Sequence, residues 1–214
     1  MKFAFVDLET TGALSSKDRI IEIGIVIIHN GIIVDTYDTL INPDRAIPPF
    51  IARMTGISNE DVKTAPRFFE VAKDIVLKLK GHIFVAHNVN FDYNFLKSEF
   101  QQLGYTFTAR RLCTIQLSRR LYPEYKSHGL SKLVKRFGLT MTDRHRALGD
   151  AKATAEFLLK TFEQKTNSHN EVKSLVNFGL QTTKLPEHIS IEILHQLPEK
   201  PGVYFLLDED RNFA

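Results

Sequence analysis

The feature that most constrains the fold is the Ile- and Val-rich run from Arg19 to His29, inside which Glu22 is the only charged residue. A run of this kind is typical of a strand in the interior of a sheet. Asn30-Gly31 follows at once and is the strongest short signal for a β-hairpin turn. We therefore expect residues 32–41 to return as a second, antiparallel strand.

The hydrophobic period changes after this hairpin. Phe3 to Leu8 adds an apolar strand in front of it, whereas from Phe68 onward apolar residues recur at helical spacing until Gly81. Helices are predicted over residues 68–79, 92–103, 116–121, 130–137 and 146–162, and strands over 83–86 and 112–115. The sequence thus predicts an α/β fold, with a mixed five-stranded sheet (three antiparallel strands, then parallel strands) flanked by helices.

The composition is that of a soluble globular protein, since 43% of the 214 residues are hydrophobic and 25% are charged. Cys113 is the only cysteine, which excludes an internal disulfide. No stretch approaches the roughly 18 apolar residues of a membrane span. We therefore expect a cytoplasmic protein with no membrane partner. The net charge of +3 is compatible with a polyanionic partner but does not identify one.

Two acidic residues on the first strand are the first candidates for chemistry. Asp7 and Glu9 lie two positions apart, so their carboxylates face the same side of the strand, about 7 Å apart along the backbone. Two acids directed together repel each other, and a hard divalent cation relieves that repulsion. The same pattern also occurs at the solvated edge of a loop, so the two residues alone leave both interpretations open.

Three further residues join these candidates. Asp92 follows a predicted strand end, where open α/β sheets keep their sites, although an acid at a helix start is also favoured simply by the free N–H groups. Asp150 lies next to the buried stripe of the last long helix and therefore needs a partner or a metal. His145 precedes that helix and can reach the same place, or it can be a solvated loop residue.

Together, these residues form three ordered motifs that resemble those of the DEDDh (DnaQ-like) 3′–5′ exonuclease family, which includes the epsilon-type proofreading subunit of bacterial DNA polymerase III. The resemblance covers residues 2–164. Phe5 to Gly12 is similar to the first motif, His87 to Asp92 to the second, and His145 to Ala151 to the third. The His five residues before the last acid points to the His subclass of the family.

The resemblance implies an RNase H-like fold and a centre of two divalent metal ions, Mg²⁺ or Mn²⁺, about 4 Å apart around the scissile phosphate. By resemblance, the ions are held by Asp7, Glu9, Asp92 and Asp150, and His145 acts as the general base. The implied product is a nucleoside 5′-monophosphate. The positions that the resemblance assigns to the terminal nucleotide are Thr10, Thr11, Gly12, Ile57, Asn88 and Phe91.

The sequence departs from the family pattern at two places. Thr55 stands where the family usually has His, in the short element that contains Ile57, and Cys113 stands where Asp is common. Neither change touches an implied metal ligand, so we expect them to affect substrate preference or packing.

The implied substrate is a DNA 3′ end, single-stranded or frayed. Basic residues gather between the second motif and Asp150, where they can hold such a strand or simply solvate helix faces; they are Arg110, Arg111, Arg119, Arg120, Lys126, Lys132, Lys135, Arg136, Arg144 and Arg146. An exoribonuclease of the same fold and a non-catalytic DNA-end binding module remain alternatives. A DNA polymerase or a repair complex is the kind of partner that the resemblance suggests.

The last residues differ from the rest. A polar stretch begins at Lys165, and the sequence predicts a domain over residues 1–164, a linker over 165–186 and a separate piece over 187–214. Residues 197–208, with Gly202-Val203-Tyr204, resemble the opening strand of a GIY-YIG nuclease domain of the UvrC type. We expect either the truncated start of such a domain, from a longer fusion protein, or a short native tail.

Overall fold

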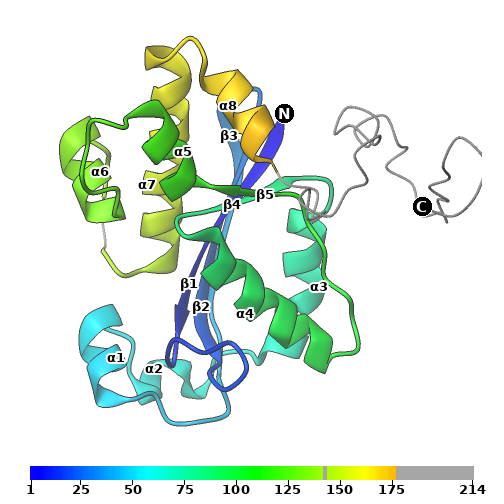
Figure 1. Cartoon of the computed structure of the whole chain (residues 1–214). Coiled ribbons are helices and arrows are strands. Elements are labelled where there is room, and N and C mark those ends of the chain that lie inside the picture. The colour runs from blue at the N-terminus through cyan, green and yellow to red at the C-terminus, as the bar shows by residue number, and fades with distance from the viewer. Residues whose placement is uncertain (142–143, 177–214) are drawn as a thin grey trace, which may run out of the picture. The chain divides into compact units, whose positions relative to one another are not determined.

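The computed structural model describes residues 1–141 and 144–176. Its sheet has the strand order β3-β2-β1-β4-β5 (Figure 1), formed by β1 (Lys2–Thr10), β2 (Ile20–His29), β3 (Ile32–Leu40), β4 (Ile83–Ala86) and β5 (Arg111–Cys113). The first three strands pair antiparallel, and β1–β4 and β4–β5 pair parallel. The predicted α/β fold with a mixed five-stranded sheet is therefore confirmed.

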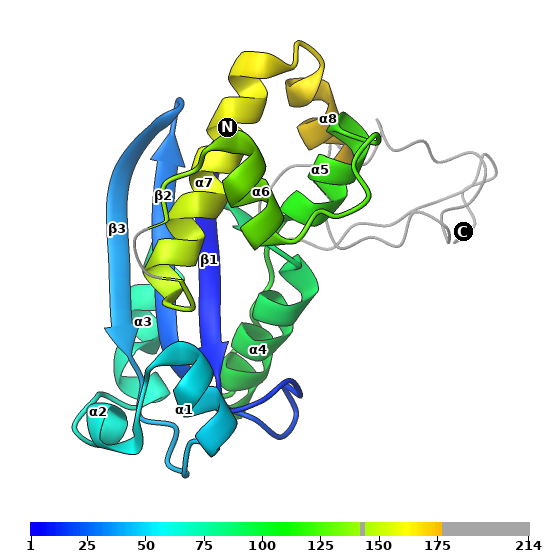
Figure 2. The ribbon, with the colours of Figure 1, turned by 90° about the vertical axis from the view of Figure 1, so that its left-hand side faces the viewer.

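Helices cover both faces of the sheet, because alternate side chains of the central strands are apolar on either side. Figure 2 shows α7 (Ala147–Gln164) lying along β1 and β2, together with α5 (Thr114–Leu121), α6 (Leu130–Phe137) and α8 (Ser168–Leu175). The opposite face packs against α3 (Phe68–Leu79) and α4 (Val89–Gln102). β1 and β2 are thus buried between two helical layers.

Two short helices that the sequence did not reveal follow β3. These are α1 (Pro49–Thr55) and α2 (Asn59–Lys63), and both figures place them at the end of the sheet toward which β1 points. They form a small core of their own with Ile21 of β2, made of Ile21, Ile47, Ile51, Ile57 and Val62. α1 is thereby fixed beside the carboxyl end of β1.

The structure differs from the sequence prediction at α4 and at α8. α4 begins at Val89, not near Asp92, because Asn88 adopts a left-handed conformation (φ 78°) that turns the chain directly from β4 into the helix. α8 lies inside the stretch predicted to be a linker, and its Val172 is buried against the α7 side of the sheet. The rest of that stretch and the GIY-YIG-like segment lie outside the described residues.

Within residues 1–141 and 144–176, no helix is long and apolar enough to cross a membrane.

Candidate active site

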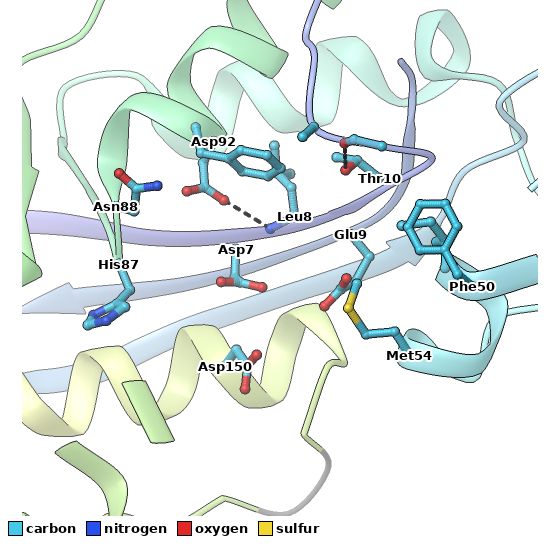
Figure 3. Close-up of a pocket in the computed structure, with 14 residues that line it drawn as sticks. Asp7, Leu8, Glu9, Thr10, Phe50, Met54, His87, Asn88, Asp92 and Asp150 are labelled. Atoms are coloured by element: carbon cyan, nitrogen blue, oxygen red, sulfur yellow. Dashed lines mark hydrogen bonds between the residues drawn. The ribbon is translucent and has the colours of Figure 1, made fainter. Parts of the chain in front are cut away.

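A cavity of about 450 Å³ opens at the carboxyl end of β1. Figure 3 shows side chains from four separate parts of the chain around it: β1, α1, the β4–α4 turn and α7. Asp7, Glu9, Asp92 and Asp150 all line it, and we refer to these four residues as the carboxylate cluster. The structure thus brings together the four acids that the three sequence motifs contributed.

The register between β1 and β2 explains how Asp150 reaches Asp7 and Glu9. Asp7 pairs with Gly24 and Glu9 pairs with Glu22, so all four residues face the helix α7. A Cβ atom on Gly24 would lie 2.3 Å from the backbone nitrogen of Leu148, so only glycine lets the helix come this close. The first turn of α7 therefore rests directly on β2 and carries Asp150 to the acids of β1.

Asp92 lies on α4, in the helical layer on the opposite face of the sheet. Its side chain is only 3% exposed, and one carboxylate oxygen accepts a hydrogen bond from the backbone N–H of Leu8, 3.2 Å away (Figure 3). This N–H lies between the two acids of β1. The hydrogen bond ties the start of α4 to β1 and places the fourth carboxylate beside the other three.

The electrostatics of the carboxylate cluster are those of acids deprived of water. Burial and the charges of Asp150 and Glu22 raise the pKa of Glu9 to about 8, and burial raises the pKa of Asp92 to about 8. Burial, reinforced by the other acids, also raises the pKa of Asp7. Without a cation, the cluster holds negative charge only at a considerable free-energy cost.

The donor set fits hard divalent cations. Ligand atoms of Glu9, His145 and Asp150 lie within 4.8 Å of one another, and one buried carboxylate oxygen of Asp150 has no hydrogen-bond partner among the described residues. Carboxylate oxygens are the ligands that Mg²⁺ and Mn²⁺ prefer. His145 reaches this position from a strained backbone, since its φ is +61°, a conformation that L-residues other than glycine rarely adopt.

The metal-free protein is expected to lose stability as the pH rises from about 4.5 to about 8, and the loss should level off at higher pH. Glu9 and Asp92 keep a proton in the folded chain up to about pH 8 but release it near their ordinary pKa when unfolded, so deprotonation opposes folding in this window. The free energy of unfolding should fall by up to about 1.4 kcal/mol per pH unit for each titrating group. Denaturant unfolding in EDTA measures the slope, and Mg²⁺ should remove it; a flat profile in EDTA would contradict the pKa shifts.

The residues expected to contact a terminal nucleotide divide into two groups. Thr10, Gly12, Asn88 and Phe91 line the cavity beside the carboxylate cluster. Thr11 instead supports the loop behind it, because its hydroxyl accepts a hydrogen bond from the backbone N–H of Arg19 at 3.0 Å.

Ile57 is not brought to the cavity. It is 2% exposed and packs in the small core between α1, α2 and β2. Phe50 and Met54 of α1 line the cavity near that position (Figure 3), and they are 59% and 47% exposed. Pro49 at the first position of α1, followed by this i, i+4 apolar pair, is the signal that could have revealed both residues.

His87 is a further lining residue that sequence reasoning left without a role. Its Nδ1 lies 3.0 Å from the hydroxyl of Thr114, and burial lowers the pKa of its imidazole to about 4, so that the ring is neutral at physiological pH. Thr114 in turn donates to the carbonyl of Ala86 at 3.4 Å. The departure at Cys113-Thr114 therefore lies next to the cavity wall, where Thr114 supports His87.

The basic residues divide into two groups in the structure. Arg146 binds Glu22, Arg120 lies 3.3 Å from Glu171, and Arg136 stacks on the ring of Tyr125 at 3.6 Å, so these three tie elements of the fold together. Five others are exposed and available to a polyanion; they are Arg119, Lys126, Lys132, Lys135 and Arg144.

Residues 4–158 match the RNase T family, whose description is "Exonuclease". The chain belongs to this exonuclease family. Its relatives include the PolC-type DNA polymerase III of Caldanaerobacter subterraneus, 41% identical over 91% of this chain and 14% of the polymerase. The 3′–5′ exonuclease DinG of Staphylococcus aureus is 40% identical over 93% of this chain and 22% of DinG. The chain therefore spans only a small part of the length of either relative.

Solved structures of the family agree with this assignment. Exonuclease X in complex with 5′ overhanging duplex DNA has a TM-score of 0.67 at 26% identity, over 82% of this chain and 99% of exonuclease X. Exonuclease I shares the fold, with a TM-score of 0.73 at 18% identity over 81% of this chain and 43% of that protein. The resemblance seen in the motifs is confirmed: the chain carries a DnaQ-like 3′–5′ exonuclease domain of the DEDDh type, a family that implies divalent metal ions.

Proposed function

We propose that this chain is a divalent-metal-dependent exonuclease that removes nucleoside 5′-monophosphates from DNA 3′ ends. The observation that carries the proposal is the convergence of Asp7, Glu9, Asp92 and Asp150 with His145 at one cavity, from parts of the chain far apart in sequence. DNA is favoured as the substrate because relatives that match nearly the whole chain are a DNA polymerase and a 3′–5′ exonuclease, and because exonuclease X was solved with DNA.

The acids, the histidine and the other cavity residues have separate parts in the proposed reaction. The carboxylate cluster would hold two divalent cations, Mg²⁺ or Mn²⁺, which when bound stabilise charge on the phosphate oxygens and make a water molecule more acidic. His145 takes the proton from the attacking water, since its ring lies beside Glu9 and Asp150. Thr10, Gly12 and Asn88 lie along the wall that faces the terminal nucleotide.

The apolar side of the cavity would receive the terminal base. Phe50, Met54 and Phe91 contribute surface there, and aromatic side chains stack on bases without regard to sequence. The exposed basic residues on α5, α6 and their connection would follow the phosphates further along the strand.

The wider context also forms part of the proposal. We propose that the domain works in the cytoplasm, either beside a DNA polymerase, as the likeness to the PolC-type polymerase suggests, or in a repair complex. We infer that the exonuclease domain includes α8, beyond the boundary predicted at residue 164, because Val172 of α8 is buried on the α7 side of the sheet; residues 187–214 carry the resemblance to the opening of a GIY-YIG-like domain.

Removal of divalent cations is expected to lower hydrolysis by about 10³-fold or more, because the carboxylate cluster alone repels a phosphodiester. The test incubates the full chain with single-stranded DNA and with RNA of the same sequence, each carrying a 5′ label, in Mg²⁺, Mn²⁺ or EDTA. A ladder that shortens from the 3′ end, with 5′-monophosphates as products, is the expected result for DNA in Mg²⁺ or Mn²⁺.

Three outcomes would contradict parts of the proposal. Hydrolysis that persists in EDTA would exclude the metal-dependent reaction. Faster hydrolysis of RNA than of DNA would make the chain an exoribonuclease. Binding of DNA in Mn²⁺ without hydrolysis would leave only a DNA-end binding module.

A further inference from the structure

We propose that Glu22 is a positioning residue that holds His145 in place for proton transfer. The inference rests on the proposed function, since it assumes that His145 acts on the attacking water. Glu22 is the lone acid inside the buried strand β2, and it is only 3% exposed. Its register partner is Glu9, so its side chain lies beside the carboxylate cluster on the face covered by α7.

Within the described part of the chain, the side-chain hydrogen bonds of Glu22 lead to the segment that carries His145. One carboxylate oxygen accepts from Nε and Nη2 of Arg146, at 2.9 Å and 2.6 Å. The other accepts from the backbone N–H of Ala147 at 2.8 Å. Glu22 thus fixes the two residues that follow His145, one through its side chain and the other through its main chain.

These contacts also distinguish Glu22 from the acids of the carboxylate cluster. Three donors already occupy its two oxygens, and a fork-shaped Arg contact together with a backbone N–H is a strong, directional arrangement. Glu22 is absent from the cavity lining, whereas Glu9 beside it is part of that lining. Glu22 therefore anchors the start of α7 rather than serving as a metal ligand.

His145 needs such an anchor. A non-glycine residue with φ near +61° persists only where the surrounding structure imposes that conformation. Glu22 fixes the chain immediately after His145, and Gly24 on the same strand lets the next peptide of α7, between Ala147 and Leu148, contact β2. Without the carboxylate of Glu22, the His145 backbone can relax and its ring can leave the vicinity of Glu9 and Asp150.

A double-mutant cycle between Glu22 and His145 tests the inference. Glu22→Gln keeps the side-chain shape but replaces one acceptor oxygen with an NH₂ donor that opposes Arg146 or Ala147. His145→Asn removes the imidazole with a residue that tolerates positive φ. We expect His145→Asn to lower kcat on single-stranded DNA by about 10²–10⁴-fold in saturating Mn²⁺. Glu22→Gln should lower kcat by about 10–100-fold with little change in KM.

The decisive comparison is Glu22→Gln in the His145→Asn background, where it should cause no further loss, because the group through which it acts is gone. Glu99→Gln is the matched control. Glu99 is also 3% exposed, pairs with Arg19 at 2.9 Å and accepts from the backbone N–H of Ile20, but it does not contact the His145 segment. Any effect of Glu99→Gln should be the same in both backgrounds.

If Glu22→Gln is poorly folded by circular dichroism, Arg146→Lys replaces it in the cycle, since lysine keeps the charge but loses the two-pronged contact. Equal losses from Glu22→Gln in both backgrounds would mean a merely structural role and overturn the inference while leaving the exonuclease intact. Near-normal kcat in His145→Asn would instead remove His145 from the proposed reaction, and the inference with it.

Discussion

Asp7→Asn is expected to lower the rate of 3′-end hydrolysis by about 10³-fold or more, while the metal-free protein becomes more stable. Asp7 lies at the centre of the carboxylate cluster, where burial and then the charges of Asp92, Asp150 and Glu9 raise its pKa. Losing this ligand removes several kcal/mol of transition-state stabilisation by bound cations, and about 4 kcal/mol corresponds to 10³ in rate. The same substitution relieves repulsion among buried acids, so the free energy of unfolding in EDTA should rise.

Asp38→Asn is the matched control for this substitution. Asp38 lies in the same row across the sheet, because Asp7 pairs with Gly24 and Gly24 pairs with Asp38, but its side chain is exposed on β3. Asp38→Asn changes the net charge by the same amount as Asp7→Asn, and it should leave both activity and stability near those of the unmodified protein. Retention of hydrolysis in Asp7→Asn, or a loss of stability in EDTA, would contradict the role given to the cluster.

Gly24→Ala is expected to destabilise the protein by about 1–3 kcal/mol and to lower activity by about 10²-fold. The added methyl carbon would meet the backbone of α7 at 2.3 Å to 2.5 Å, at Ala147 and Leu148, and backbone atoms cannot move aside without shifting the helix. That shift carries Asp150 away from the acids of β1. Thermal or denaturant unfolding measures the first effect, and hydrolysis titrated with Mn²⁺ measures the second, with a higher Mn²⁺ concentration needed for half-maximal rate.

Gly129→Ala provides the comparison. Gly129 precedes α6 with a φ of −65°, and a Cβ atom there meets nothing within 4 Å, so activity should be retained. If Gly24→Ala were as active as Gly129→Ala, the close approach of α7 to β2 would not be what positions Asp150.

Local patterns in the sequence predict much of this fold. Three signals predict structure strongly because each depends on residues close together in sequence. They are the apolar run of β2, the Asn-Gly turn and the helical period of α3. The members of the carboxylate cluster could also be predicted from the sequence, since they occur in motifs with ordered spacing. The family resemblance, rather than spacing alone, linked these motifs across the chain.

The features that could not be predicted from the sequence depend on contacts between segments far apart in the chain. α1 has only seven residues, and it is held by a small core with Ile21, so its own period is too short to reveal it. The family resemblance placed Ile57 at the nucleotide, and the small core that buries it could not be predicted from the sequence. Glu22 stood out as a charge in an apolar strand, but its partner Arg146 is 124 positions away.

The order in which the site's parts occur along the chain has a consequence for synthesis. Asp7 and Glu9 are made first, Asp92 follows, and Asp150 on α7 is the last of the four to be translated. A ribosome-bound chain that ends before α7 lacks one wall of the cavity and the histidine beside it. On the proposed function, the catalytic cavity is therefore complete only after nearly the whole domain has been translated.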